Sequence, residues 1–155
     1  MIGNESERLR DLIRLGTDIA EVKDLDVLME RILQSARDFV VCDAGSIYIR
    51  EGDTLNFTYA QNDTLASRLA PGEKLIYTTF SMPISDTSIA GHVALTGEQL
   101  NIPDAYAIPP GTPYSFGKSF DESTNYRTRS ILTVPLKTQT GAVIGVLQLI
   151  NALGP

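Results

Sequence analysis

The sequence predicts an α+β fold, with helices at the N-terminal end and antiparallel strand pairs after them. Three observations predict it. Residues 5–41 repeat apolar side chains with a helical period, residues 44–61 contain two alternating segments around a turn, and residues 130–150 contain two apolar runs rich in Val, Ile, Leu and Thr. Helices and strand pairs that occupy separate stretches of a chain are typical of this class.

Composition and charge narrow the range of functions. The 155 residues predict one domain, residues 1–155, and a formal net charge of −6 without a Lys/Arg cluster argues against a nucleic-acid partner. No apolar run is long enough to cross a bilayer, and the first residues contain no signal-peptide core. The one cysteine excludes an internal disulfide and fits a reducing compartment. We therefore expect a cytoplasmic protein without membrane insertion.

The N-terminal third predicts a pair of helices. Residues 5–22 form a narrow amphipathic stripe, Asp24 is a suitable N-cap for a second helix that continues to about residue 41, and residues 21–23 are a short connection. A narrow stripe packs either on the sheet of its own domain or on the same helix of a second subunit, and the sequence leaves both alternatives open. The stripe consists of Leu9, Leu12, Ile13, Gly16, Ile19 and Ala20.

Two strands follow, at residues 44–50 and 54–61, joined by a turn. Strict alternation in the second strand places Leu55, Phe57 and Tyr59 on one face. Residues 62–85 give a weaker signal.

Within that weaker stretch, we expect a helical turn near residues 64–69 and a strand near residues 75–80. A short helix is predicted next, capped by Thr87 or Ser88 at its start and by Gly97 after its end. Its first turn, residues 89–91, has small or apolar side chains, so its free N–H groups form an anion site unless these residues serve only close packing.

The C-terminal half contains a loop and a strand hairpin. A short strand at residues 98–102 precedes a Pro/Gly-rich loop, residues 103–119, whose length is typical of lids and binding loops. In the hairpin, Pro135 indicates a break or an unpaired edge, and the run at residues 142–150 predicts a central strand that is buried on both faces. Gln148 interrupts this run, so it needs a hydrogen-bond partner in the fold or on a ligand.

No pattern of catalytic residues is visible. The one histidine, His92, lies mid-helix among apolar neighbours, and the one cysteine, Cys42, lies at a helix end where burial is expected. Metal-protease, Cys-x-x-Cys, phosphate-loop and dinucleotide motifs do not occur. The sequence therefore indicates a binding domain rather than an enzyme.

Three segments together resemble a known family. IAGHVALTGEQLNIPDAY (89–106), FDESTNYRTRSILTVPL (120–136) and GAVIGVLQLIN (141–151) resemble a GAF domain, in particular the cyclic-nucleotide-binding branch found in phosphodiesterases and adenylyl cyclases. The resemblance extends over nearly the whole chain. It implies a six-stranded antiparallel sheet with the terminal helices on one face and a ligand pocket on the other.

The resemblance also implies a set of ligand-binding residues. Two would face a purine from the first strands, two would offer backbone N–H groups to a cyclic phosphate, three would line the ribose and phosphate side, and one would reach the ligand from the central strand. In that order they are Ser46 and Gln61; Ile89 and Ala90; Asp121, Thr124 and Thr128; and Gln148. No catalytic residue, metal or cofactor is implied.

What the resemblance implies is a regulatory sensor and not an enzyme. The domain would bind cyclic AMP or cyclic GMP, order the loop over it, and relay occupancy through its terminal helices to a covalently linked output domain. The open alternative is an interaction-only module that mediates dimerisation and has an empty or vestigial pocket. The chain stops soon after Asn151, so we expect a segment of a larger signalling protein that lacks the final helix and forms a homodimer through residues 5–40.

Overall fold

The computed structural model describes residues 2–75 and 79–153, and the side chains of residues 2–6 and 11–23 are outside this description. The chain divides into two compact units, residues 1–32 and 33–155. The six-stranded sheet and the helices that cover it belong to the second unit, so the fold is α+β as predicted. No helix in the described part of the chain is both long and apolar enough to span a bilayer.

The N-terminal helical segment is one helix, α1 (Ile2–Val40), and the predicted helix pair is wrong. Residues 17–40 contain no Gly or Pro that would interrupt the helical hydrogen bonds, so Asp24 lies inside the helix and caps nothing. Of the predicted apolar stripe, Leu9 is exposed, and the side chains of its other five members lie outside the described residues.

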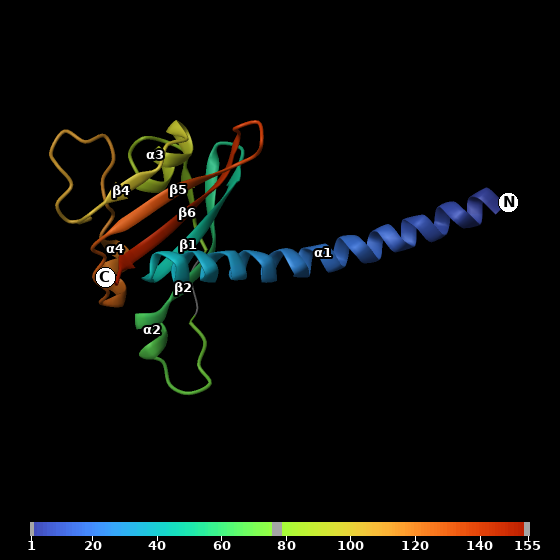
Figure 1. Cartoon of the computed structure of the whole chain (residues 1–155), viewed down its shortest axis with the longest axis horizontal. Helices are drawn as coiled ribbons and strands as arrows, with labels where there is room; N and C mark the ends of the chain where they lie inside the picture. The colour runs from blue at the N-terminus through green and yellow to red at the C-terminus, as the bar shows by residue number, and fades with distance from the viewer. Residues whose placement is uncertain (1, 76–78, 154–155) are drawn as a thin grey trace. The chain divides into compact units, whose positions relative to one another are not determined.

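The sheet contains six antiparallel strands in the order β3-β2-β1-β6-β5-β4 (Figure 1). The strands are β1 (Cys42–Glu51), β2 (Thr54–Asn62), β3 (Ser81–Pro83), β4 (Leu100–Ile102), β5 (Ile131–Lys137) and β6 (Val143–Ala152). Both predicted hairpins are confirmed, because β1 pairs with β2 and β5 pairs with β6. The strand expected near residues 75–80 falls partly on residues 76–78, outside the described residues.

The C-terminal hairpin contains the predicted central strand, but burial is limited to its middle, and Ile144 is 53% exposed. β6 lies between β1 and β5, and its residues 145–149 are all buried. Pro135 pairs with Val146, but β4 pairs with β5 only as far as Thr133. The missing N–H of Pro135 therefore falls on the part of β5 that has no second neighbour.

A β-bulge in β2 changes which side chains share a face. Ile47 pairs with Tyr59, whereas the next residue, Tyr48, pairs with Phe57, so Thr58 is the extra residue. Because one extra residue reverses the alternation, Tyr59 does not share the face of Leu55 and Phe57. The predicted common face of these three residues is wrong, and Ala60 takes the position opposite Ser46.

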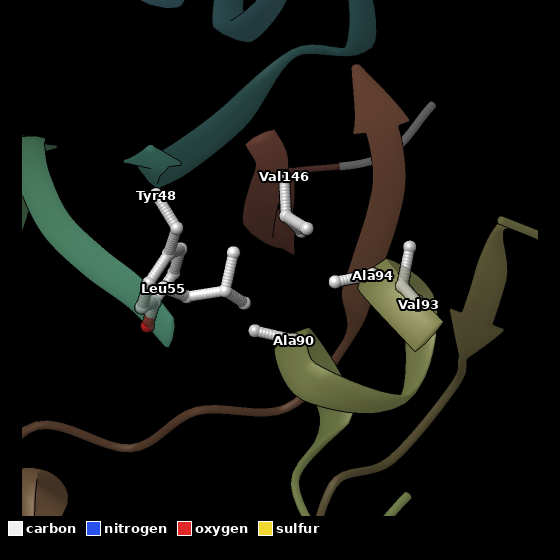
Figure 2. Packing of buried hydrophobic residues seen from close by; sticks show 6 residues of the cluster. All are labelled: Tyr48, Leu55, Ala90, Val93, Ala94 and Val146. Carbon is white, nitrogen blue, oxygen red and sulfur yellow. The ribbon is translucent and has the colours of Figure 1, made fainter. Parts of the chain in front are cut away.

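Three short helices complete the unit: α2 (Asp63–Ser67), α3 (Ile89–Thr96) and α4 (Ser119–Thr124). The helical turn expected near residues 64–69 is α2, and the predicted caps of α3 are confirmed as Ser88 and the left-handed Gly97. Ala90, Val93 and Ala94 of α3 pack on the sheet in a core cluster with Tyr48, Leu55 and Val146 (Figure 2).

The last two turns of α1 pack on the other face of the sheet. A Cβ added to Gly45 would lie 2.9 Å from Leu33 Cδ1 and 3.3 Å from Arg37 Cγ. Glycine at this position therefore lets the helix approach β1 closely. Within the second unit, the last turns of α1 lie on one face of the sheet and α3 on the other, as the resemblance implied for the N-terminal helix.

Candidate functional site

A cavity of about 770 Å³ lies within the second unit, on the face of the sheet that carries α3. β1, β2 and β6 contribute its floor, and α3, α4 and the loop between β4 and α4 contribute its walls. The volume lies within the range of about 300–1,000 Å³ that is common for small-molecule sites. All eight residues predicted to bind a ligand line this one cavity: Ser46, Gln61, Ile89, Ala90, Asp121, Thr124, Thr128 and Gln148.

A row of three buried polar side chains crosses the sheet, and two of them, Ser46 and Gln148, line the cavity. Ser46 on β1 is opposite Gln148 on β6, and Gln148 is opposite Thr133 on β5. Directly opposed residues point to the same face, so the row presents a hydroxyl, an amide and a second hydroxyl side by side. Thr133 was not predicted, because only the strand register reveals its place in the row. Among the described residues its Oγ1 has no hydrogen-bond partner.

The first turn of α3 offers backbone donors to the cavity. Ser88 Oγ accepts a hydrogen bond of 3.0 Å from Gly91 N, while Ile89 and Ala90 line the cavity just before it. N–H groups in the first turn of a helix have no carbonyl partner within the helix, so they suit an anionic group. Gly91 is required for close packing here, because an added Cβ would lie 2.8 Å from Ser85 O and 3.0 Å from Pro83 O.

The residues predicted to line the ribose and phosphate side already form hydrogen bonds within the protein. Asp121 accepts hydrogen bonds of 2.8 Å from both Thr128 N and Thr128 Oγ1, and one of 2.6 Å from the Tyr106 hydroxyl. Thr124 Oγ1 donates to Phe120 O at 2.6 Å. These residues line the cavity, but the hydroxyl protons of both threonines are used within the protein, which leaves their oxygens as acceptors.

Thr124 and Thr128 do not share a helical turn, although their spacing of four residues predicts hydroxyls on one side of such a turn. Helix α4 ends at Thr124, and Asn125 adopts a left-handed conformation with φ of 50°. Asn tolerates this conformation better than most residues, so it ends the helix. Thr128 reaches the cavity wall from the extended segment beyond the helix, through its bonds to Asp121.

The Gln61 amide is turned away from the expected purine position. Its Oε1 accepts a hydrogen bond of 2.8 Å from Arg37 Nη1, on the face of the sheet where α1 packs. The β2 bulge explains this orientation, because it reverses the alternation after Phe57 and places Ala60 on the cavity face. Sequence reasoning from unbroken alternation had no signal for that reversal.

Arg37 links the end of α1 to the strands beside the cavity. The residue is buried, and its guanidinium also donates to Asp43 O at 2.9 Å and pairs with Asp63 at 2.6 Å. The side chain therefore connects α1, the start of β1 and the start of α2. Sequence reasoning missed this role, because Arg37 occupies an unremarkable position on a helical pattern.

The loop between β4 and α4, residues 103–118, is tied to the cavity wall by Tyr106. Its ring packs under the Arg127 guanidinium at 3.6 Å and near Lys118 Nζ at 5.2 Å. The hydrogen bond to Asp121 raises the pKa of Tyr106. At the other end of the loop, Ser115 N donates to Thr87 O at 2.9 Å, next to the start of α3.

The cavity contains little charge of its own. Among the described residues that line it, Asp121 is the one carboxylate, and neither Lys nor Arg occurs. The described residues also include no cluster of three or more His, Cys, Asp or Glu side chains that could hold a metal. The arrangement suits binding through backbone donors, hydroxyls, amides and apolar contact.

A model of the family "GAF domain" matches residues 24–155. The chain belongs to the GAF family. Its sequence relatives include a Dual 3',5'-cyclic-AMP and -GMP phosphodiesterase 11 from Drosophila melanogaster, 32% identical over 97% of this chain and 10% of the relative. A cGMP-specific 3',5'-cyclic phosphodiesterase from Drosophila virilis is 32% identical over 96% of this chain and 16% of the relative. The matched region is thus a small part of each of these longer proteins.

Solved GAF structures agree with the fold. The crystal structure of the A. aeolicus nlh2 GAF domain in an inactive state superposes with a TM-score of 0.58 and 17% identity, covering 81% of this chain and 67% of that chain. At this identity the likeness shows the fold alone. Family membership and the phosphodiesterase relatives together support a regulatory, ligand-binding GAF domain.

Proposed function

We propose that this GAF domain is a sensor that binds a cyclic nucleotide, cyclic AMP or cyclic GMP, and that it regulates an output domain without catalysing a reaction itself. The observation that carries the proposal is the convergence of eight residues, separated by up to 102 positions in the sequence, on one cavity of about 770 Å³ (from 46 to 148). The two related phosphodiesterases support the ligand class, because their names specify cyclic nucleotides.

The chemistry of the cavity supports an anionic ligand with a polar ring. The first turn of α3 provides N–H donors for a phosphate, which needs no cationic side chain when backbone dipoles converge on it. Ser46 and Gln148 together offer donor and acceptor groups to the edge of a base. The oxygens of Thr124 and Thr128 can accept from ribose hydroxyls while their protons remain bonded within the protein.

A route from the cavity to α1 is available through Arg37. The cavity residue Gln61 accepts a hydrogen bond from Arg37, and Arg37 belongs to the last turns of α1. A ligand that shifts the end of β2 changes the hydrogen bonds that hold this helix end. Occupancy would then reach a covalently linked output domain through the helix.

The second candidate function is dimerisation through α1. Leu25, Leu28 and Ile32 are exposed and follow the i, i+3, i+7 spacing of one helical face. Such a face is typical of helices that pack against a second copy. Light scattering over a wide concentration range tests it: a dimer that Leu28→Glu converts to a monomer supports this function, and an unchanged monomer rejects it.

Calorimetric titration with cyclic AMP and cyclic GMP tests the sensor function. We expect saturable binding of at least one nucleotide, weakened about fivefold by Gln148→Leu, since one lost hydrogen bond is worth roughly 1 kcal/mol. Gln139→Leu is the matched control, because Gln139 is exposed in the turn between β5 and β6. Heat from neither nucleotide, or equal weakening by both variants, rejects the proposal.

A further inference from the structure

One end of the cavity is apolar and aromatic. It is formed by Tyr48, Phe57, Phe80 and Met82, which we call the aromatic end. Ala44, Ser46 and Tyr48 are successive cavity-facing residues of β1, so Tyr48 lies about 13 Å from Ala44 along the strand.

The opposite end of the cavity, beside Ala44, is polar. Ala44 packs with Tyr126, and Tyr126 N donates a hydrogen bond to Asp121 O. Asp121 and the residues hydrogen-bonded to its carboxylate therefore lie at this end of the cavity. The cavity therefore has two chemically different ends, with the polar row of Ser46 and Gln148 between them.

The rings of the aromatic end form a rigid platform. Phe57 and Phe80 are stacked with centroids 4.9 Å apart and an interplanar angle of 13°. Tyr48 meets both rings edge-on, at 5.4 Å and 6.2 Å. Phe57 N also donates to Phe80 O at 2.9 Å, so the backbones that carry the stacked pair are joined. A preformed stack of this kind loses little entropy when a third ring joins it.

The platform is incompletely covered. Phe80 is 46% exposed in spite of its contacts, and exposed aromatic surface in a cavity favours an apolar occupant. Ala60, opposite Ser46, provides only a methyl group, and the Gln61 amide is turned toward Arg37. Because neither Ala60 nor Gln61 offers a flat surface to the cavity, the aromatic end is the part of the strand side on which a ring can stack.

The position of Met82 connects this end to the anion-binding turn. Ser88 Oγ, the N-cap of α3, donates to Met82 Sδ at 3.5 Å. The aromatic end is therefore adjacent to the backbone N–H groups of Ile89 and Ala90. A ligand that combines a flat ring with an anionic group can reach both.

We propose that the aromatic end is the subsite for the flat ring of the ligand. The inference rests on the proposed function and adds an orientation to it: the ring packs on the exposed side of the Phe57–Phe80 stack, with its polar edge toward Ser46 and Gln148. The class of ligand is a planar heteroaromatic ring that carries an anionic group. Phe80 then determines ring affinity, although it was absent from the sequence-based set.

The three methionines of the chain allow a site-specific test. Protein with ¹³C-labelled methionine methyl groups is titrated with indole, a neutral flat ring, and separately with cyclic AMP and cyclic GMP. The Met82 methyl reports ring currents at the aromatic end, and Met29, in α1, is the internal control. Phe80→Ala is compared with Phe120→Ala, because both phenylalanines line the cavity and are similarly exposed, at 46% and 44%.

We expect indole to shift the Met82 signal saturably, to leave Met29 unchanged, and to bind about tenfold more weakly to Phe80→Ala but not to Phe120→Ala. A Met82 signal that does not respond to indole, or equal weakening by both variants, overturns the subsite. The nucleotide titrations separate the two proposals. A Phe80-dependent response to indole without a response to either nucleotide rejects cyclic-nucleotide sensing and retains the ring subsite, whereas a nucleotide that binds without shifting Met82 rejects the orientation alone.

Discussion

The hydroxyl of Tyr106 donates a hydrogen bond of 2.6 Å to Oδ2 of Asp121, and this contact joins the loop beside the cavity to helix α4. Asp121 is at the same time bonded to Thr128, so one carboxylate holds three segments of the cavity wall. Asp121, which the family resemblance predicted as a ligand contact, therefore also holds the loop of residues 103–118 against the cavity wall.

Tyr106→Phe should loosen the loop without removing the ring contacts. The variant keeps the packing under Arg127 but loses one hydrogen bond, worth roughly 1 kcal/mol, so loop amides should exchange about fivefold faster. Hydrogen-exchange mass spectrometry of residues 103–118 measures this. Tyr114→Phe is the control, since Tyr114 lies in the same loop and its ring packs on His92 at 4.9 Å. Equal exchange in both variants would contradict the role of Tyr106.

Arg37→Met should destabilise the domain much more than the loss of its ion pair would. The substitution removes the donors to Gln61 and to the carbonyl of Asp43, and we expect a cost of about 2–3 kcal/mol. Asp63→Asn should cost less than about 1 kcal/mol, because the Asp63 side chain is 71% exposed. Urea unfolding of the two variants measures both free energies. Similar costs would show that the ion pair, and not the buried hydrogen bonds, dominates.

Val41→Gly should stabilise the domain. Val41 follows the last residue of α1 and has φ of 59°, a left-handed conformation that is unfavourable for a β-branched residue. Relief of this strain should raise the free energy of unfolding by about 1 kcal/mol. Val27→Gly, at a similarly exposed position inside α1, should instead lower it by up to about 1 kcal/mol. Thermal unfolding of both variants tests the opposite signs, and a loss of stability in both would refute the strain argument.

Stability should fall in alkali because of Tyr48. Burial raises the pKa of Tyr48 to about 12, above its usual value of 10.0. Below pH 10 the phenol is protonated in both states, so no stability is lost there. Between about pH 10 and 12 only the unfolded chain releases the proton, which lowers the free energy of unfolding by on the order of 3 kcal/mol. Urea titrations from pH 9 to 12 should show this fall, and Tyr48→Phe should reduce it; an identical fall in the variant would assign it to other groups.

The hairpins and the short helix α3 follow from local patterns. Apart from Gln148, residues 142–150 are Gly or apolar, which suits a strand covered on both faces, and Ser88 and Gly97 supply the caps of α3. The long N-terminal helix was misread, because Asp24 is a good N-cap by residue type. Capping preference is worth only about 1 kcal/mol and does not break a helix whose residues 17–40 contain no Gly or Pro.

The sequence by itself determined the strand pairs, the capped helix and, through three matching segments, the eight residues that meet at the cavity. Only the tertiary structure decided the orientation of those residues. The bulge at Thr58 turned Gln61 toward Arg37, and the strand register placed Thr133 beside Gln148. The physical reason is that the pattern of apolar side chains indicates which faces of a segment are buried. Pairing between strands that are distant in the sequence decides which partner each side chain contacts.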